Sequence, residues 1–208
     1  MCMAPVARLL YMYTKVRGYK VVSRFFPHQV REMPLLLDAL ERFESPTWEC
    51  LYVLLLWLSS VVLVPFPLDR GTPSPSERIH RLCARFLSRP GKERDAASIV
   101  LGRLYAREEC ELFFSAFLQD AEQATASLVP TGVLQTLCAF VKQADASLIR
   151  AHYDAMLRVI AHLRTVDTRN MLVDRYAIKL EGRLAMHDPR DAHVDTCLLY
   201  TSPSPRDA

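Results

Sequence analysis

The stretch WECLYVLLLWLSSVVLVPFPL, from Trp48 to Leu68, decides the class of protein that this sequence encodes. From Cys50 to Leu68 it carries no charged residue, and most of its side chains are Leu, Val or aromatic. A helix that is hydrophobic on every side must be buried, either in lipid or among other helices. The rest of the sequence has to supply one of these two environments.

The length of the stretch argues against a membrane span, because Pro65 ends a regular helix near Val64. A helix from about Pro46 to that point would include Glu49, so its charge-free part holds about 15 residues, or roughly 22 Å at 1.5 Å per residue. The hydrocarbon core of a bilayer is about 30 Å thick. We therefore expect a central helix covered by other helices and no membrane span, with a small membrane protein anchored by residues 48–68 as an alternative.

The composition predicts an all-α protein with a sizeable core. Of the 208 residues 50% are hydrophobic and only 6 are glycine. Apolar residues recur at three- and four-residue spacings almost everywhere, which is typical of amphipathic helices. A loop is expected from about Pro65 to Ser76, and a helix after Ser45, which is a good N-cap residue. Further helices are expected at Ser76–Ser88, Lys92–Tyr105, Glu109–Leu128, Thr131–Gln143, Ala146–Leu163 and Arg169–Met186.

The expected helices form pairs joined by short turns, and equivalent helices lie about forty residues apart, which is the period of HEAT and armadillo repeats. The segment KERDAASIVLGRL, from Lys92 to Leu104, has the small-and-large apolar stripe of a second repeat helix: Ala96, Ala97, Val100, Leu101 and Leu104. Before the stripe, Asp95 complements the helix dipole and Arg94 is placed to reach an adjacent repeat. The sequence thus predicts a HEAT/armadillo-type α-solenoid over residues 1–190, and an ordinary helical bundle is the alternative.

Charge and cysteine usage narrow the possible functions. Lys and Arg number 26 against 23 Asp and Glu, a formal net charge of +3, and the two signs are mixed along the chain. No basic cluster of the kind that binds nucleic acid is visible. The six cysteines form no CxxC pair, and we expect reduced, buried thiols in a cytoplasmic protein: Cys2, Cys50, Cys83, Cys110, Cys138 and Cys197.

One segment combines aromatic and basic residues. VRGYKVVSRFFPHQV contains three of each kind: Tyr19, Phe25 and Phe26 with Arg17, Lys20 and Arg24. The favoured interpretation places the aromatic side chains in the core and the cations on a solvated face. The alternative is a ridge that binds an acidic partner, of which tubulin would be one.

No catalytic site, cofactor site or metal site is predicted, and we expect a non-enzymatic protein. The sequence contains no Gly-rich phosphate loop, no GxSxG elbow and no HExxH motif. His187, His193 and Cys197 come nearest to a metal cluster, but their spacing fits no zinc pattern. The acidic run REECE, from Arg107 to Glu111, is interpreted as the favourable start of a helix.

Five segments, in this order and spacing, resemble the N-terminal part of the tubulin-folding cofactor D family. They are TKVRGYKVVSRFFPHQV (Thr14–Val30), WECLYVLLLWLSSVVLVPFPLDR (Trp48–Arg70), ERDAASIVLGRL (Glu93–Leu104), GVLQTL (Gly132–Leu137) and IKLEGRL (Ile178–Leu184). Each piece is common by itself, whereas the combination is specific and extends over most of the chain.

The resemblance implies a HEAT-repeat scaffold that binds β-tubulin. With tubulin-folding cofactors C and E and an ARF-like small GTPase, such proteins assemble and take apart the αβ-tubulin dimer and support GTP hydrolysis on tubulin without a catalytic centre of their own. A HEAT-type scaffold for another cytosolic partner is the alternative. Because family members are far longer, we expect an N-terminal fragment. Residues 196–208 match nothing in the family and are expected to be a disordered, artefactual tail.

Overall fold

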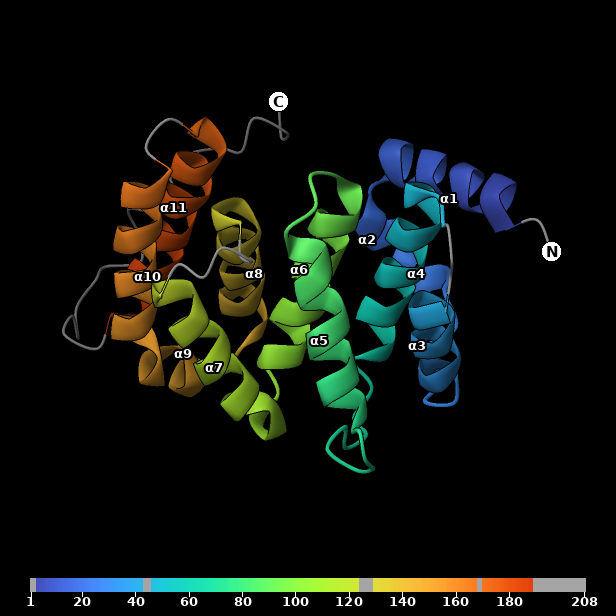
Figure 1. The fold of residues 1–208 in the computed structure, drawn as a ribbon, viewed down its shortest axis with the longest axis horizontal. Coiled ribbons are helices and arrows are strands. Elements are labelled where there is room, and N and C mark those ends of the chain that lie inside the picture. The colour runs from blue at the N-terminus through green and yellow to red at the C-terminus, as the bar shows by residue number, and fades with distance from the viewer. Residues whose placement is uncertain (1–2, 43–45, 124–128, 168–169, 189–208) are drawn as a thin grey trace.

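The computed structural model describes residues 3–42, 46–123, 129–167 and 170–188. All regular secondary structure within these ranges is helical. Figure 1 shows the helices stacked side by side along one direction, from α1 (Met3–Arg17) at one end to α11 (Met171–Leu184) at the other. The predicted α-solenoid is therefore confirmed.

The helices form two layers. The inner layer consists of helices that pack directly on one another: α4 (Trp48–Val61), α6 (Lys92–Tyr105), α8 (Pro130–Gln143) and α11. The outer layer consists of the preceding helix of each pair: α3 (Glu32–Arg42), α5 (Pro75–Leu87), α7 (Glu111–Glu122) and α10 (Tyr153–Val166). Neighbours in the inner layer contact one another more extensively than neighbours in the outer layer do. This difference gives the array its curvature.

Helix α4 contains the stretch that looked like a membrane span. Leu55, Leu56 and Leu58 have no exposed surface, because α1, α3 and α6 cover the helix from different sides. No helix in the described ranges is long and apolar enough to cross a membrane. The hydrophobic surface of α4 is covered by neighbouring repeats, as predicted.

The end of α4 differs from the prediction, because the helix stops at Val61 rather than Val64. The chain then tightens into short turns, in which the amide of Val64 donates to the Val61 carbonyl at 3.1 Å. The reason is Arg107, whose guanidinium donates to the carbonyls of Val62, Val64 and Phe66 at 2.8, 2.9 and 2.7 Å. These carbonyls turn toward a cation of the next repeat instead of continuing the helix.

The contact between α6 and α8 is the closest helix packing in the inner layer. A Cβ atom at Gly102 of α6 would lie 2.4 Å from the Cβ atom of Ala139 in α8. Only glycine allows the two backbones to approach so closely. The predicted apolar stripe of this helix is confirmed, because its five members are fully buried.

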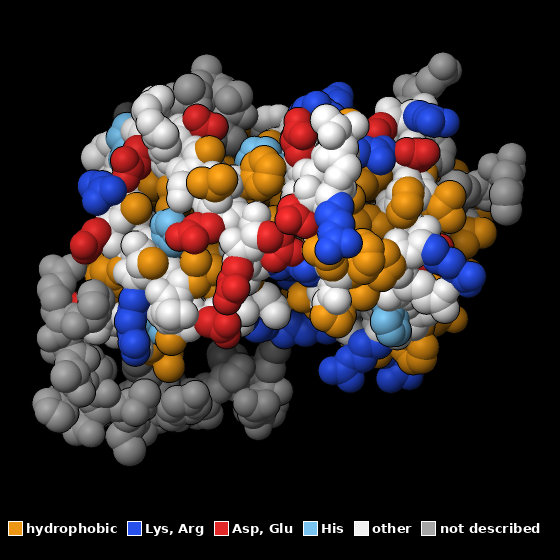
Figure 2. All heavy atoms as spheres, turned by 90° about the horizontal axis from the view of Figure 1, so that it is seen from below, with side chains coloured by type: hydrophobic (Ala, Val, Ile, Leu, Met, Phe, Trp, Pro, Cys, Tyr) orange, Lys and Arg blue, Asp and Glu red, His pale blue; other side chains and the backbone are white. Residues whose placement is uncertain are grey.

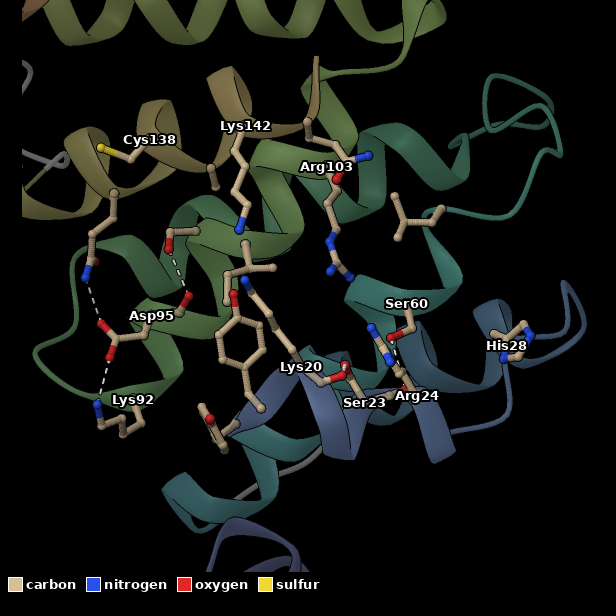
Figure 3. A pocket seen from close by; sticks show the side chains of 18 of the residues that line it. Lys20, Ser23, Arg24, His28, Ser60, Lys92, Asp95, Arg103, Cys138 and Lys142 are labelled. Atoms are coloured by element: carbon tan, nitrogen blue, oxygen red, sulfur yellow. Dashed lines mark hydrogen bonds and ion pairs between the residues drawn. The ribbon is translucent and has the colours of Figure 1, made fainter. Parts of the chain in front are cut away.

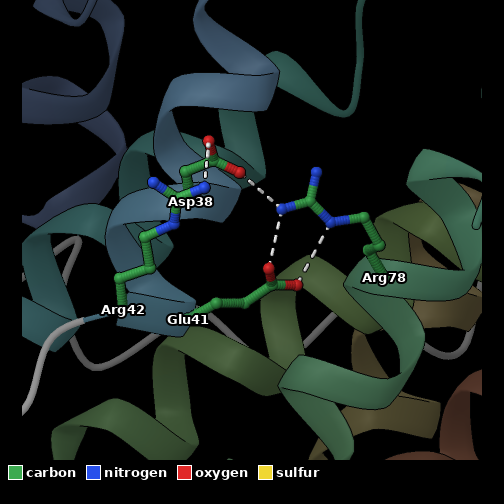
Figure 4. Close-up of polar contacts among 4 residues, drawn as sticks. All are labelled: Asp38, Glu41, Arg42 and Arg78. Atoms are coloured by element: carbon green, nitrogen blue, oxygen red, sulfur yellow. Dashed lines mark hydrogen bonds and ion pairs between the residues drawn. The ribbon is translucent and has the colours of Figure 1, made fainter.

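The outer layer links its helices through ion pairs. Arg78 of α5 binds two carboxylates of α3: Asp38 at 2.7 Å and Glu41 at 2.7 and 3.2 Å (Figure 4). The Asp38 carboxylate also lies 3.6 Å from the guanidinium of Arg42. Further along the layer, Arg158 of α10 donates to a carboxylate oxygen of α7 at 2.8 Å.

Other helix boundaries also differ from the sequence prediction. The expected helix Ala146–Leu163 is two helices, α9 (Ala146–Ala151) and α10, which meet at His152. The ring of His152 packs edge-on against Phe114 of α7, 5.0 Å between ring centres, and the backbone breaks to allow this contact. Helix α7 follows a 3-10 turn at Glu108–Cys110.

The start of helix α5 lies one residue from its predicted position at Ser76. The helix begins at Pro75, and the hydroxyl of Ser74 accepts a hydrogen bond from the amide of Glu77 at 3.2 Å. This is the expected N-terminal signal of a helix. The N-cap residue of α4 is Thr47, and Ser45 lies outside the described residues.

The described cysteines agree with the prediction of reduced, buried thiols. Cys50, Cys83, Cys110 and Cys138 are buried and free, while residues 2 and 197 lie outside the described ranges. Burial raises the pKa of the Cys110 thiol to about 12, with a smaller contribution from the Glu109 carboxylate. Burial also raises the pKa values of the Cys83 and Cys138 thiols, so these three thiols are protonated and unreactive at neutral pH.

Candidate functional site

A sharp turn at Gly18 places the first basic side chains of the site. Gly18 has φ = +81°, a left-handed conformation that favours glycine, and it separates α1 from α2 (Tyr19–Val22). The chain then folds over α4, where the Phe26 ring stacks on Trp57 with 6.0 Å between centres. The indole nitrogen of Trp57 also donates to the Pro27 carbonyl. These contacts hold α2 and the 3-10 turn Ser23–Phe25 against the inner layer.

A groove runs along the inner layer beside this segment. It has a volume of about 1180 Å³ and is lined by side chains of α2, α4, α6, α8 and α11 (Figure 3). We call it the basic groove, because one carboxylate, that of Asp95, faces it together with Lys92 and six further Lys and Arg residues. These six are Lys20, Arg24, Arg103, Lys142, Lys179 and Arg183.

The Asp95 carboxylate is fully engaged. One oxygen accepts from the Lys92 ammonium at 3.0 Å, and the other accepts from the Gln135 side-chain amide at 2.8 Å. The same amide nitrogen donates to the Tyr176 hydroxyl at 2.9 Å. Asp95 thus links three inner-layer helices, and it neutralises Lys92 rather than any of the six other cations.

The structure corrects the role expected for the residue pair Arg94–Asp95. Asp95, which was expected only to complement the helix dipole, contacts an adjacent repeat, because its carboxylate reaches Gln135 of α8. The Nε atom of Arg94 is buried without a hydrogen-bond partner.

Two cations of the groove face each other from different helices. Lys20 extends from α2 and Lys142 from α8, and their ammonium groups point toward one another (Figure 3). The Lys20 ammonium lowers the pKa of Lys142 to about 8, with partial burial and the charges of Arg183 and Lys179 adding to the effect. The groove therefore holds positive charge at an electrostatic cost.

Two arginines of the groove bind backbone carbonyls instead of carboxylates. Arg103 donates to the Ser59 carbonyl at 2.6 Å, and Arg183 donates to the Cys138 carbonyl. Burial lowers the pKa of Arg103. Both guanidinium groups are held in fixed positions, and neither forms an ion pair with a carboxylate of the described residues.

The aromatic and basic residues of the segment Val16–Val30 lie in different environments in the structure. Phe26 is buried, as the favoured interpretation states, whereas Phe25 is 82% exposed. Tyr19, Lys20 and Arg24 line the groove, which was not expected of a simple solvated face.

The sequence analysis missed the basic groove itself. It predicted no basic cluster, yet the fold gathers cations from five separate helices or turns into one place. No local sequence pattern predicts this cluster, because its members, such as Lys20 and Arg183, lie far apart in the chain. By contrast, the surface seen in Figure 2 carries side chains of both charge signs.

Of the three residues that came nearest to a metal cluster in the sequence, the structure describes only one. His187 lies in the 3-10 turn Ala185–His187, and His193 and Cys197 lie outside the described residues. The acidic run is interpreted correctly in part: Glu111 opens α7, whereas Glu109 accepts from Arg107 at 2.7 Å and fixes the residue that caps α4.

Comparison with known proteins identifies the family. Residues 1–125 match the family model described as tubulin-specific chaperone D-like, ARM repeat. The chain is also 31% identical over 139 residues to tubulin-folding cofactor D of Schizosaccharomyces pombe, a match that covers 64% of this chain and 13% of that protein. No solved structure gives a significant match.

The family match includes the helices that contribute Lys20, Arg24 and Arg103 to the groove, whereas Lys142, Lys179 and Arg183 follow it. It also covers more than half of the chain. The chain therefore belongs to the tubulin-specific chaperone D-like family of ARM-repeat proteins.

Proposed function

We propose that the chain is part of a tubulin-folding cofactor D-type chaperone scaffold that binds β-tubulin. The observation that carries the proposal is the family match over residues 1–125, together with the similarity to a protein named tubulin-folding cofactor D. A curved helical array with one open groove supports it, because α-solenoids bind proteins along extended inner surfaces.

In this proposal the scaffold takes part in assembling and taking apart the αβ-tubulin heterodimer in the cytoplasm and at the cytoskeleton. It acts with tubulin-folding cofactors C and E and with an ARF-like small GTPase, and it supports GTP hydrolysis on tubulin without donating a catalytic group. The chemistry of the groove agrees with such a role, because its fixed guanidinium and ammonium groups suit binding rather than proton transfer.

Capture of tubulin tests the proposal directly. The immobilised 208-residue chain, shown by circular dichroism to be helical, is incubated with purified αβ-tubulin, and the retained protein is identified by mass spectrometry. We expect β-tubulin to be retained, at a level above that on a matrix carrying an unrelated helical-repeat protein. Equal retention on the two matrices would contradict the proposal. Capture of a different cytosolic protein in preference to tubulin would favour the alternative scaffold.

A further inference from the structure

The basic groove contains more positive charge than the protein itself neutralises. Lys20, Arg24, Arg103, Lys142, Lys179 and Arg183 form no ion pair with any carboxylate in the described ranges. Cations elsewhere, such as the partly buried Arg78 and the more exposed Arg158, do have carboxylate partners. Exposed cations that have none in the described ranges, such as Arg81 and Arg85, do not line the groove. The absence of internal partners in one place indicates that the groove is built for an external anion.

The position of Lys20 and Lys142 strengthens this conclusion. Their ammonium groups come from segments that are distant in sequence, and the fold brings them together against their mutual repulsion. A carboxylate placed between them would interact favourably with both. The lowered pKa of Lys142 reflects the proximity of the Lys20 ammonium group.

The dimensions of the groove indicate what kind of anion fits. Its volume of about 1180 Å³ exceeds the usual range of small-molecule pockets, about 300–1,000 Å³. Four inner-layer helices at interaxial distances of about 8–10 Å give a length of roughly 25–30 Å. An extended chain of about eight or nine residues covers this length at 3.3 Å per residue.

The lining between the cations is partly apolar. Leu63, Ile99 and Ala139 face the groove among the charged side chains. A lining with both cationic and apolar side chains suits a peptide, which can present carboxylates and apolar side chains together. A nucleic acid would instead present a continuous row of phosphates, for which a mostly charged surface is typical.

We propose that the basic groove binds an extended acidic segment of a protein partner, with carboxylates seated between Lys20 and Lys142 and along α11 toward Arg183. The inference rests on the proposed function in one respect, which is that the segment belongs to tubulin. The preference for an acidic peptide depends only on the groove.

A labelled peptide tests the preference. A fluorescein-labelled peptide of ten glutamates is titrated with the 208-residue chain, and binding is followed by fluorescence anisotropy at low salt. The groove variant is Lys20→Gln with Lys142→Gln. The control variant is Arg81→Gln with Arg85→Gln, which removes the same charge from exposed positions on α5 outside the groove.

We expect the groove variant to bind the peptide roughly tenfold more weakly, which corresponds to about two partly exposed ion pairs. The control variant should stay within about twofold of the unchanged chain. Equal weakening in both variants would overturn the inference, because binding would then follow net charge alone. Tighter binding of a ten-nucleotide DNA strand, lost in the groove variant, would overturn it by assigning the groove to nucleic acid.

The titration of Lys142 provides an independent readout. Its side chain is expected to titrate near pH 8, and bound peptide should raise this pKa because carboxylates stabilise the ammonium form. The Lys20→Gln substitution alone should also raise it, because it removes the main cause of the shift. NMR of the lysine side chains measures both effects. A Lys142 pKa that is unchanged by saturating peptide would contradict the proposed seat.

Tubulin capture by the same three proteins separates this inference from the proposed function. Weaker capture by the groove variant than by the control variant supports the inference. Equal capture by all three overturns it and leaves the proposed function in place. No capture by any of them, with peptide binding still lost in the groove variant, overturns the proposed function and preserves the peptide preference of the groove.

Discussion

The inner and outer layers of the array connect successive repeats by different means. Inner-layer helices touch through close apolar packing, as at Gly102 and Ala139, where the backbones nearly meet. Outer-layer helices are linked by ion pairs at their surfaces, as between Arg78 and the two carboxylates of α3. Close packing excludes water and is insensitive to salt, whereas exposed ion pairs are weak and screened.

This difference assigns separate tasks to the two layers. The inner layer holds the repeats together by close packing and also supports the groove on its open face. The outer layer sets the spacing of the repeats at little energetic gain. The comparison predicts a steep gradient in the cost of substitutions, from the centre of the inner layer to the surface of the outer layer.

The largest effect is expected for Leu56→Ala in α4. This side chain is fully buried, and its removal leaves a cavity, so the free energy of unfolding should fall by about 2–5 kcal/mol. The matched control is Leu35→Ala in α3, where the side chain is 65% exposed and the change should stay within about 0.5 kcal/mol. Urea unfolding of both variants measures the difference. Similar losses of unfolding free energy in the two variants would contradict the expected difference between the centre of the inner layer and the surface of the outer layer.

The next effect concerns the closest inner-layer contact. Gly102→Ala adds a methyl group where Ala139 leaves no room, so α6 and α8 must separate, at a cost of about 1–3 kcal/mol. Gly182→Ala in α11 is the control, because no atom lies within 4 Å of the added carbon. There the better helix propensity of alanine should stabilise the protein by about 0.5–1 kcal/mol. Thermal unfolding should therefore give shifts of opposite sign, and shifts of the same sign would show that the two helices are not in close contact.

A comparable or smaller effect is expected for Arg107→Met, which leaves the carbonyls after α4 without their cationic partner. The loss of these hydrogen bonds should cost about 1–3 kcal/mol and should increase amide exchange around Val64 before that of the helix centre. Arg150→Met, at an exposed position of α9, serves as the control. Unchanged exchange at the end of α4 would contradict the capping role.

The smallest effect belongs to the outer layer. Arg78→Met should destabilise the protein at pH 7 far less than Leu56→Ala does, because the ion pairs are mainly exposed. Hydrogen bonding to Arg78 lowers the pKa of Asp38 and of Glu41.

The acid dependence of this pair follows from the direction of those shifts. Carboxyl pKa values that are lowered by folding contribute stability above their ordinary values near 4, and this stability is lost as the pH falls through the lowered values. The difference between the unchanged protein and the Arg78 variant should therefore be smaller at pH 3 than at pH 7. Urea unfolding at pH 7 and pH 3 measures it. A difference that grows in acid would contradict the assignment.

The sequence was sufficient for the features that depend on local pattern. The apolar period predicted the helices, and the length of the charge-free part of α4 favoured a covered helix. Gly102 stood inside a predicted apolar stripe, although only the structure shows which helix approaches it.

Features that depend on distant residues were not predictable. The break at His152 arises from a ring contact with α7, and no glycine or proline marks it. The early end of α4 is caused by Arg107, and the basic groove combines Lys20 with Arg183. In each case the cause lies in another repeat, where a local sequence pattern carries no information about it.

The dependence of α4 on the following repeat has a consequence for the synthesis of the chain. Ser59 receives its hydrogen bond from Arg103, 44 residues later, and α6 covers one side of the same helix. At a translation rate of about 5–20 residues per second, roughly 2–9 s pass before that partner has been made. During this interval the strongly hydrophobic helix α4 lacks the packing of α6 while the ribosome is still synthesising the chain. We therefore expect α4 to be the segment of the nascent chain to which a holding chaperone binds first.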